Sequence, residues 1–310
     1  MGGKLKIQPI SRVGLDPLVD MAEQLRALLP GWTDTAPAEG RARVPSPLAR
    51  DLAHLARHDA DGLFTASIGD EVVGFGVNYV RGRQLLLAQL WLLPDFVDHP
   101  VAAALVRRAL VFGDRAAAQD YSAHVLGGAP HEALLFRFGF RPRFPVYRLV
   151  LPAEQALDAG RVLAAALPGG ELTQDAMARR VGFADLERLD RLTRGVTRPM
   201  DHEYWVNERG LRLATVRDGK LVAGYAYGGQ GQCGPVVAST GEGAMAALGW
   251  SLQFAAHAGD QVEVLVPAVF ETAVETLLET GAQCPAAGSW MSRAPVSGLN
   301  RCVLPGVTLF

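Results

Sequence analysis

The stretch 232–248, which reads QCGPVVASTGEGAMAAL, has the residue types of an anion-binding site. A short β-branched run leads into a glycine-rich turn, and an alanine-rich helix is expected from Ala244 to about His257. The first N–H groups of a helix and its positive dipole end attract anions, and glycine lets a phosphate approach the backbone. The residues predicted to form the site are Val236, Val237, Ala238, Ser239, Thr240, Gly241, Gly243 and Ala244. The alternative is that Ser239 and Thr240 only cap the helix.

A second group, Asp201-His202-Glu203, has the residue types of an acid–base site. A histidine near its reference pKa takes a proton from an amine at neutral pH, so His202 is the candidate base, with Asp201 and Glu203 beside it. The alternative is a solvated helix start in which Asp201 is favoured by the helix dipole.

The composition limits the classes of function. The 310 residues have a net charge of −2 and are 49% apolar, which predicts two domains with ordinary cores. The sequence shows no basic block, no apolar run near the ~20 residues of a membrane span and no secretory h-region. We therefore expect a cytoplasmic protein that binds neither nucleic acid nor membrane. The cysteines, Cys233, Cys284 and Cys302, fit no metal-binding spacing, so they are expected to be reduced and no metal site is predicted.

The chain reads as one unit written twice, which predicts domains at 1–151 and 152–310. Val73-Gly74-Phe75-Gly76 corresponds to Ala223-Gly224-Tyr225-Ala226. A proline-rich loop is expected up to Pro45, and a turn at Pro168-Gly169-Gly170. In the first half we expect helices at 18–29, 46–58, 100–119 and 131–138, and strands at 4–10, 62–68, 72–81, 84–93, 121–126 and 139–151. In the second half we expect helices at 153–167, 183–193, 199–207, 244–257 and 268–279, and strands at 211–216, 220–228, 236–237, 261–266 and from 281.

This order of elements resembles the GNAT acyltransferase superfamily. Val72-Val73-Gly74-Phe75-Gly76, Leu90-Trp91-Leu92-Leu93-Pro94 and Leu134…Gly139-Phe140 carry the resemblance in the first half. The second half looks like the divergent C-terminal domain of tandem GNAT proteins. The resemblance implies an α/β (α+β) fold of two tandem GNAT-like domains, each a mixed, splayed sheet of six to seven strands with flanking helices. It also implies that acetyl-CoA lies in the splay and that an amine attacks its thioester, helped mainly by positioning and oxyanion donors.

The two halves depart differently from the family's pyrophosphate loop, Arg/Gln-x-x-Gly-x-Gly/Ala. In the first half the loop is 97–102, where only Ala102 fits and Pro100 removes one N–H donor. The second half keeps both glycines, so it is predicted to bind acetyl-CoA. The less favoured second site consists of Leu92, Leu93, Val101 and Ala102.

Catalytic groups typical of the family are missing. Leu135 and Leu277 stand where many members have a proton-donating tyrosine, and Gln89 replaces an acid on the fourth strand. His124 and His131, which flank a strand, are interpreted as structural. The prediction is an acetyl-CoA-dependent N-acyltransferase that acts on an unknown amine, with one active and one degenerate domain, as a monomer or homodimer. The alternatives are an inactive CoA- or small-ligand-binding sensor or assembly module, and a structural dimerisation module.

Overall fold

A computed structural model describes residues 4–32, 46–126, 128–167, 171–174, 183–257 and 259–309. The loop predicted before Pro45 falls largely outside these ranges, and the turn predicted at 168–170 falls wholly outside them. The chain forms two compact units: unit 1 is 1–143 with 288–295, and unit 2 is 144–287 with 296–310. In the described residues, no helix has the length and apolar character to cross a membrane.

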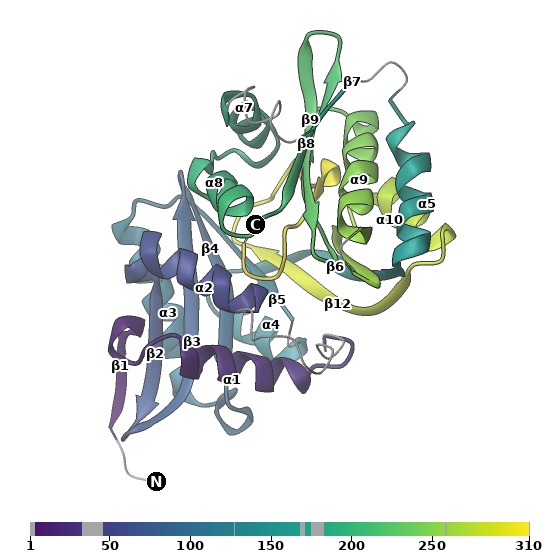
Figure 1. Cartoon of the computed structure of the whole chain (residues 1–310). Coiled ribbons are helices and arrows are strands. Elements are labelled where there is room, and N and C mark those ends of the chain that lie inside the picture. The colour runs from purple at the N-terminus through teal and green to yellow at the C-terminus, as the bar shows by residue number, and fades with distance from the viewer. Residues whose placement is uncertain are drawn as a thin grey trace. The chain divides into compact units, whose positions relative to one another are not determined.

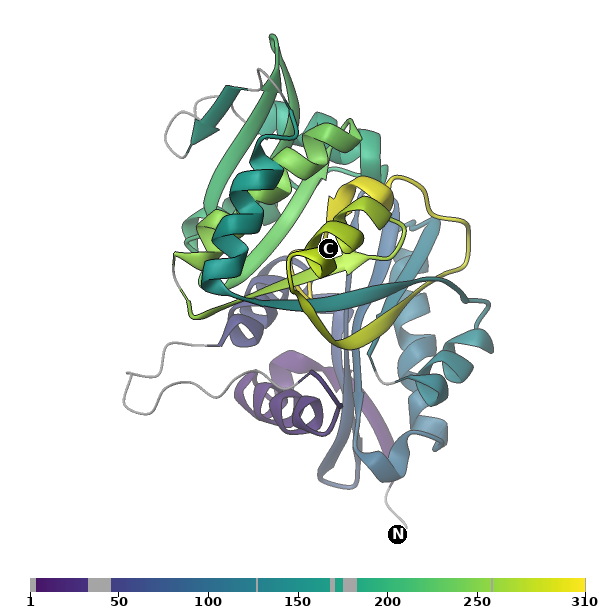
Figure 2. The same ribbon diagram turned by 90° about the vertical axis from the view of Figure 1, so that its right-hand side faces the viewer.

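Unit 1 is a mixed sheet with helices on both faces. The strand order is β1-β2-β3-β4-β5-β12, in which only the β4–β5 pair is parallel. The strands are β1 Leu5–Pro9, β2 Leu63–Ile68, β3 Glu71–Arg81, β4 Gln84–Leu92, β5 Asp120–Val125 and residues 288–292 of β12 Gln283–Ser292. The helices are α1 Asp16–Ala27, α2 Pro47–His58, α3 Pro100–Arg115 and α4 Ala129–Phe136. Helices α1 and α2 cover one face of these strands, and α3 and α4 cover the other (Figures 1 and 2).

Unit 2 repeats this plan. The strand order is β7-β8-β9-β10-β11-β6, again with one parallel pair, β10–β11, and with β13 added to β10. Its strands are β6 Arg141–Pro152, β7 Glu171–Gln174, β8 Arg212–Asp218, β9 Leu221–Gly229, β10 Gln232–Ala238, β11 Gln261–Pro267 and β13 Cys302–Val303. Its helices are α5 Ala153–Ala164, α7 Phe183–Arg194, α8 Pro199–Asn207, α9 Gly241–Ala256 and α10 Glu271–Glu279. The predicted fold class is confirmed in both units.

The two units exchange one strand each. Strand β6, which follows the elements of unit 1 in the chain, pairs from Val146 to Pro152 with β11 of unit 2. Strand β12, which follows the elements of unit 2, pairs from Ser289 to Ser292 with β5 of unit 1. The compact units therefore differ from the sequence halves 1–151 and 152–310 by these two strands.

Several local features differ from the sequence-based prediction; among them, strand β7, Glu171–Gln174, is not predicted. Helix α9 begins at Gly241 and not at Ala244, because the Thr240 hydroxyl accepts a hydrogen bond from the Gly243 N–H (3.1 Å) and caps the helix. The expected glycine-rich loop is therefore the first turn of a helix. Strand β13 is too short to give a period-2 pattern and was not predicted.

Helix α9 is the centre of unit 2, where it packs on β9 and against α5 (Figure 2). Glycines set how closely these elements approach. A Cβ atom on Gly249 would lie 2.6 Å from the Gly160 carbonyl oxygen of α5 and 2.4 Å from the Ala164 nitrogen. Real Cβ atoms do not approach backbone so closely, so the contact between α5 and α9 requires glycine at position 249.

We predict that Gly249→Ala destabilises the protein by about 1–3 kcal/mol, because the added methyl group forces α5 away from α9. The measurement is the free energy of unfolding from chemical denaturation. The control is Gly241→Ala on the same helix, where a Cβ atom meets nothing within 4 Å. That variant should be neutral or slightly more stable. Equal destabilisation by the two substitutions would contradict the packing argument.

Candidate functional site

Strands β4 and β5 form a fork in unit 1. Among the described residues, their ladder runs from Gln84 paired with Asp120 to Leu87 paired with Ala123, and then the strands separate. Ala88 is an extra residue in the ladder between β3 and β4, because Asn78 pairs with Leu87 and Val77 with Gln89. Such a β-bulge leaves the extra residue outside the ladder and turns the strand.

A cavity of about 220 Å³ lies at this fork. Its walls come from both diverging strands, from the end of α1 on one face of the sheet and from α4 on the other. Leu92, a residue of the less favoured predicted site, lines it, as do Val97 and Leu135. The cavity therefore lies at the fork and has walls from both faces of the sheet.

Three residues with polar atoms project toward the α1 face of the cavity. Gln89, Trp91 and His124 alternate along their strands with residues that pack in the α3–α4 core, so they point to the opposite face. The Trp91 indole N–H donates to the Gln89 side-chain oxygen (3.0 Å), and the His124 ring lies edge-on to Trp32 at 6.2 Å. Burial lowers the pKa of His124 to about 3, so its imidazole is neutral at physiological pH.

The low pKa of His124 predicts an acid-sensitive fold. The unfolded chain binds a proton at His124 below about pH 6.5, whereas the folded protein does not until about pH 3. The free energy of unfolding should therefore decrease as the pH is lowered through this window. His124 contributes up to about 1.4 kcal/mol of this decrease per pH unit. Chemical denaturation at pH values from 7 to 4 measures the free energy of unfolding. This free energy should decrease less steeply with falling pH in His124→Gln than in the wild type. Parallel curves for the two proteins would contradict the assignment.

The start of α3 lies beyond the end of β4. The His99 imidazole accepts a hydrogen bond from the Val101 N–H (3.2 Å) and caps the helix, and the Ala102 N–H donates to the His99 carbonyl. Val101 and Ala102 are buried, whereas Leu93 is half-buried and its N–H donates to Val73. His99 therefore accepts hydrogen bonds from two N–H groups in the first turn of α3, those of Val101 and Ala102.

The equivalent fork in unit 2 is filled by the chain itself. Strands β10 and β11 pair at Cys233 and Val264 and then separate. In the gap, Val303 and Cys302 of β13 pair with Val236 and Val237, and the Leu304 N–H donates to the Leu265 carbonyl (3.0 Å). A Cβ atom on Gly234 would lie 2.5 Å from the Leu304 oxygen, so this close approach requires glycine.

The other residues predicted to bind the cofactor also have partners within unit 2. The Ser239 hydroxyl donates to the Ala223 carbonyl (3.0 Å), and the Arg301 guanidinium donates to the Ser239 carbonyl. Ala238, Gly243 and Ala244 are buried, whereas Thr240 and Gly241 are exposed. The structure thus brings the predicted residues together at the start of α9. Val236 and Val237 of β10, however, already pair with β13.

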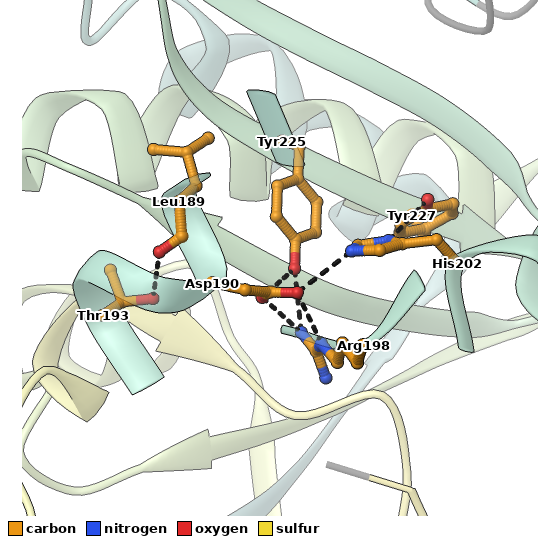
Figure 3. A network of polar contacts seen from close by, with 7 residues as sticks. All are labelled: Leu189, Asp190, Thr193, Arg198, His202, Tyr225 and Tyr227. Atoms are coloured by element: carbon orange, nitrogen blue, oxygen red, sulfur yellow. Dashed lines mark hydrogen bonds and ion pairs between the residues drawn. The ribbon is translucent and has the colours of Figure 1, made fainter. Parts of the chain in front are cut away.

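His202 lies in a buried polar network of unit 2 (Figure 3). Its Nε2 lies 3.0 Å from a carboxylate oxygen of Asp190, and its Nδ1 lies 2.9 Å from the Tyr227 hydroxyl. Arg198 binds Asp190 through two nitrogens (3.0 and 3.1 Å), and the Tyr225 hydroxyl donates to Asp190 (2.5 Å). His202 and the adjacent Asp201 are fully buried, whereas Glu203 is exposed and takes no part in these contacts.

Electrostatic interactions within this network hold its side chains together in the interior of unit 2. Burial alone would raise the pKa of Asp190, but the Arg198 charge and the His202 hydrogen bond outweigh it and hold this pKa well below its usual range. Burial raises the pKa of Tyr225 and Tyr227 well above the ordinary value, so both phenols stay protonated. The network fastens α7 and α8 to β9. Sequence reasoning missed Asp190 and Arg198, because they lie eight positions apart in an ordinary amphipathic pattern.

We predict that Asp190→Asn destabilises the protein by about 3–5 kcal/mol, because it leaves the buried Arg198 charge without its counterion. The matched control is Asp185→Asn on the same helix. Asp185 pairs with Arg188 at 3.6 Å, but the two side chains are 37% and 42% exposed, so its loss should cost under about 1 kcal/mol. Thermal denaturation of both variants is the measurement. Similar losses of stability in the two variants would show that the buried network stabilises the fold no more than the exposed pair does.

No family model matches the sequence, and no curated protein matches it significantly. Solved structures do match its fold. A candidate acetyltransferase from Pyrococcus horikoshii is 16% identical with a TM-score of 0.72, over 100% of this chain and 97% of the other. A GCN5-related N-acetyltransferase from Sphaerobacter thermophilus is 14% identical with a TM-score of 0.58, over 96% and 98%.

A tandem GNAT protein from the clavulanic acid biosynthesis pathway is also similar, with 15% identity and a TM-score of 0.56, over 95% of this chain and 100% of the other. These matches span both units. The chain therefore has the tandem GNAT fold, and the resemblance predicted from the sequence is confirmed at the level of fold. Identities this low establish the fold alone.

Proposed function

We propose that this protein is an acetyl-CoA-dependent N-acyltransferase whose working site is the β4–β5 fork of unit 1. The observation that carries the proposal is the difference between the two forks. The fork of unit 1 contains a cavity of about 220 Å³, whereas β13 pairs along the strand edge in the fork of unit 2. The GNAT fold of the similar structures supports an acyltransferase activity in general.

The free edge of β4 fits the amide-rich arm of an acyl-CoA. Beyond Leu87 the ladder with β5 has ended, so the β5-facing edge of β4 is open to a linear ligand that pairs as an added strand. The bulge at Ala88 lies at the apex of the fork, where a carbonyl oxygen of the thioester would lie. A backbone N–H outside the ladder at this point is the type of donor that stabilises an oxyanion.

His124 is the ionisable residue placed to contact the attacking amine. It lies on the α1 face of the cavity, and burial lowers its pKa to about 3, so the neutral imidazole can accept a hydrogen bond from the amine but is too weak a base to hold its proton. His202, the base predicted from the sequence, is fully buried with both ring nitrogens in contact with partners, so we assign it to the structural network.

Titration calorimetry with acetyl-CoA tests the choice of unit, and we expect one site per chain. Pro100→Glu and Gly241→Glu place the same carboxylate at the first residue of α3 and of α9, and both positions are exposed. Repulsion of the pyrophosphate by Pro100→Glu should weaken binding by about 10–100-fold, allowing for solvent screening. Gly241→Glu should leave binding unchanged. Two sites per chain would show that both units bind the cofactor, and the reverse response of the two variants would return the cofactor to unit 2; either result would overturn the assignment to unit 1 alone.

One observation favours a second candidate function, a CoA-binding module without turnover. Leu135 lines the cavity at the position where the resemblance expects a proton-donating tyrosine, and Gln89 stands in place of an acid. Binding of acetyl-CoA without acetylation of any amine would support this function. Formation of an N-acetyl product, lowered by His124→Gln with acetyl-CoA affinity unchanged, would exclude it.

A further inference from the structure

The α1 face of the unit 1 cavity has apolar walls. Leu25, Leu28 and Leu29, at the end of α1 and in the turn after it, line the cavity opposite the strands. Leu28 lines the cavity and is 65% exposed, so it lies at the cavity mouth. The turn is held in place, because the Trp32 N–H donates to the Leu29 carbonyl (3.1 Å) and the Arg26 guanidinium donates to the Trp32 carbonyl (2.9 Å).

The second feature of the cavity is the charge of the residues that line it. Across the part of the chain that the structure describes, the lining contains no aspartate, glutamate, lysine or arginine. Its ionisable residues are His124 and His131, and burial keeps His124 neutral. A ligand with a second positive charge would therefore meet no countercharge here, although the leucines offer it apolar contact.

We propose that the acceptor is a monoamine: an alkyl or aryl body that carries its charge only at the reacting nitrogen and binds against Leu25, Leu28 and Leu29. This inference rests on the proposed function. The neutral amine nitrogen forms a bond to the acetyl carbonyl carbon, and the carbon–sulfur bond breaks. The proton lost by nitrogen ends on the released thiol. Diamines, polyamines and aminoglycosides are disfavoured, because burial of an unpaired ammonium group is unfavourable, whereas burial of a methylene group is favourable.

A matched pair of amines tests the inference directly. Hexylamine and cadaverine have nearly the same length, but cadaverine has an ammonium group in place of the terminal methyl group. We expect the kcat/KM for acetylation of hexylamine to exceed that of cadaverine by at least about tenfold, the discrimination typical of an apolar pocket. Product formation is followed by mass spectrometry. Equal or reversed preference would overturn the inference.

A charge placed at the cavity mouth should change this preference. Leu28→Glu supplies the missing countercharge at a position exposed enough to tolerate it, so the preference for hexylamine should fall by at least about threefold. The control is Leu192→Glu, in the last turn of α7 in unit 2, where the leucine is 58% exposed. The control should keep the wild-type ratio. An unchanged ratio in Leu28→Glu, with wild-type thermal stability, would overturn the inference.

Two further measurements separate this inference from the proposed function. Calorimetry measures the affinity of the two amines without turnover. Tighter binding of hexylamine together with no acetyl transfer would support the apolar pocket while refuting the enzyme. The apolar walls also have a second candidate occupant, a longer acyl chain. Preference for hexanoyl-CoA over acetyl-CoA, with no preference between the amines, would assign the walls to the acyl chain and overturn the acceptor proposal.

Discussion

Backbone N–H and C=O groups need hydrogen-bond partners, and two parallel strands that separate part-way along their length deprive both of their facing edges of those partners. This chain contains that situation twice, at β4–β5 and at β10–β11. In unit 2 the partners come from residues 302–304 of the same chain. In unit 1 the strands separate around a cavity. The two forks therefore differ in whether residues of the same chain pair along the separated strand edges.

The fold was readable from the sequence because its elements have strong local patterns. Helix α8 was predicted at its observed bounds, Pro199–Asn207, and the hairpins of both units lie within two residues of their predicted positions. The exchange of β6 and β12 was not readable, because a strand's pattern shows that it pairs but not with which partner. Strand β13 was not predictable for a different reason: its two residues are too few to show the alternating pattern of a strand.

The candidate site was harder to predict than the fold. The glycines at 241 and 243 fit an anion site and a capped helix start equally well, and only the position of Thr240 shows that the cap is present. The burial of His202 depends on Asp190 and Tyr227, which are 12 and 25 residues away in sequence. His124 lines the cavity where β4 and β5 separate, and nothing in a single sequence shows that two strands separate beside it. In each case the missing information was long-range pairing.

The exchanged strands also bear on how the protein is made. Unit 1 contains residues 288–295, and the Arg143 guanidinium binds the Ser292 hydroxyl (2.8 Å) across 149 positions of sequence. A ribosome that has released the first 143 residues has therefore not yet supplied the strand that covers the edge of β5. An uncovered edge is a template for pairing with other chains. Until residues 288–295 are synthesised, the edge of β5 lacks the strand of this chain that pairs with it, so the native sheet of unit 1 is completed only late in synthesis.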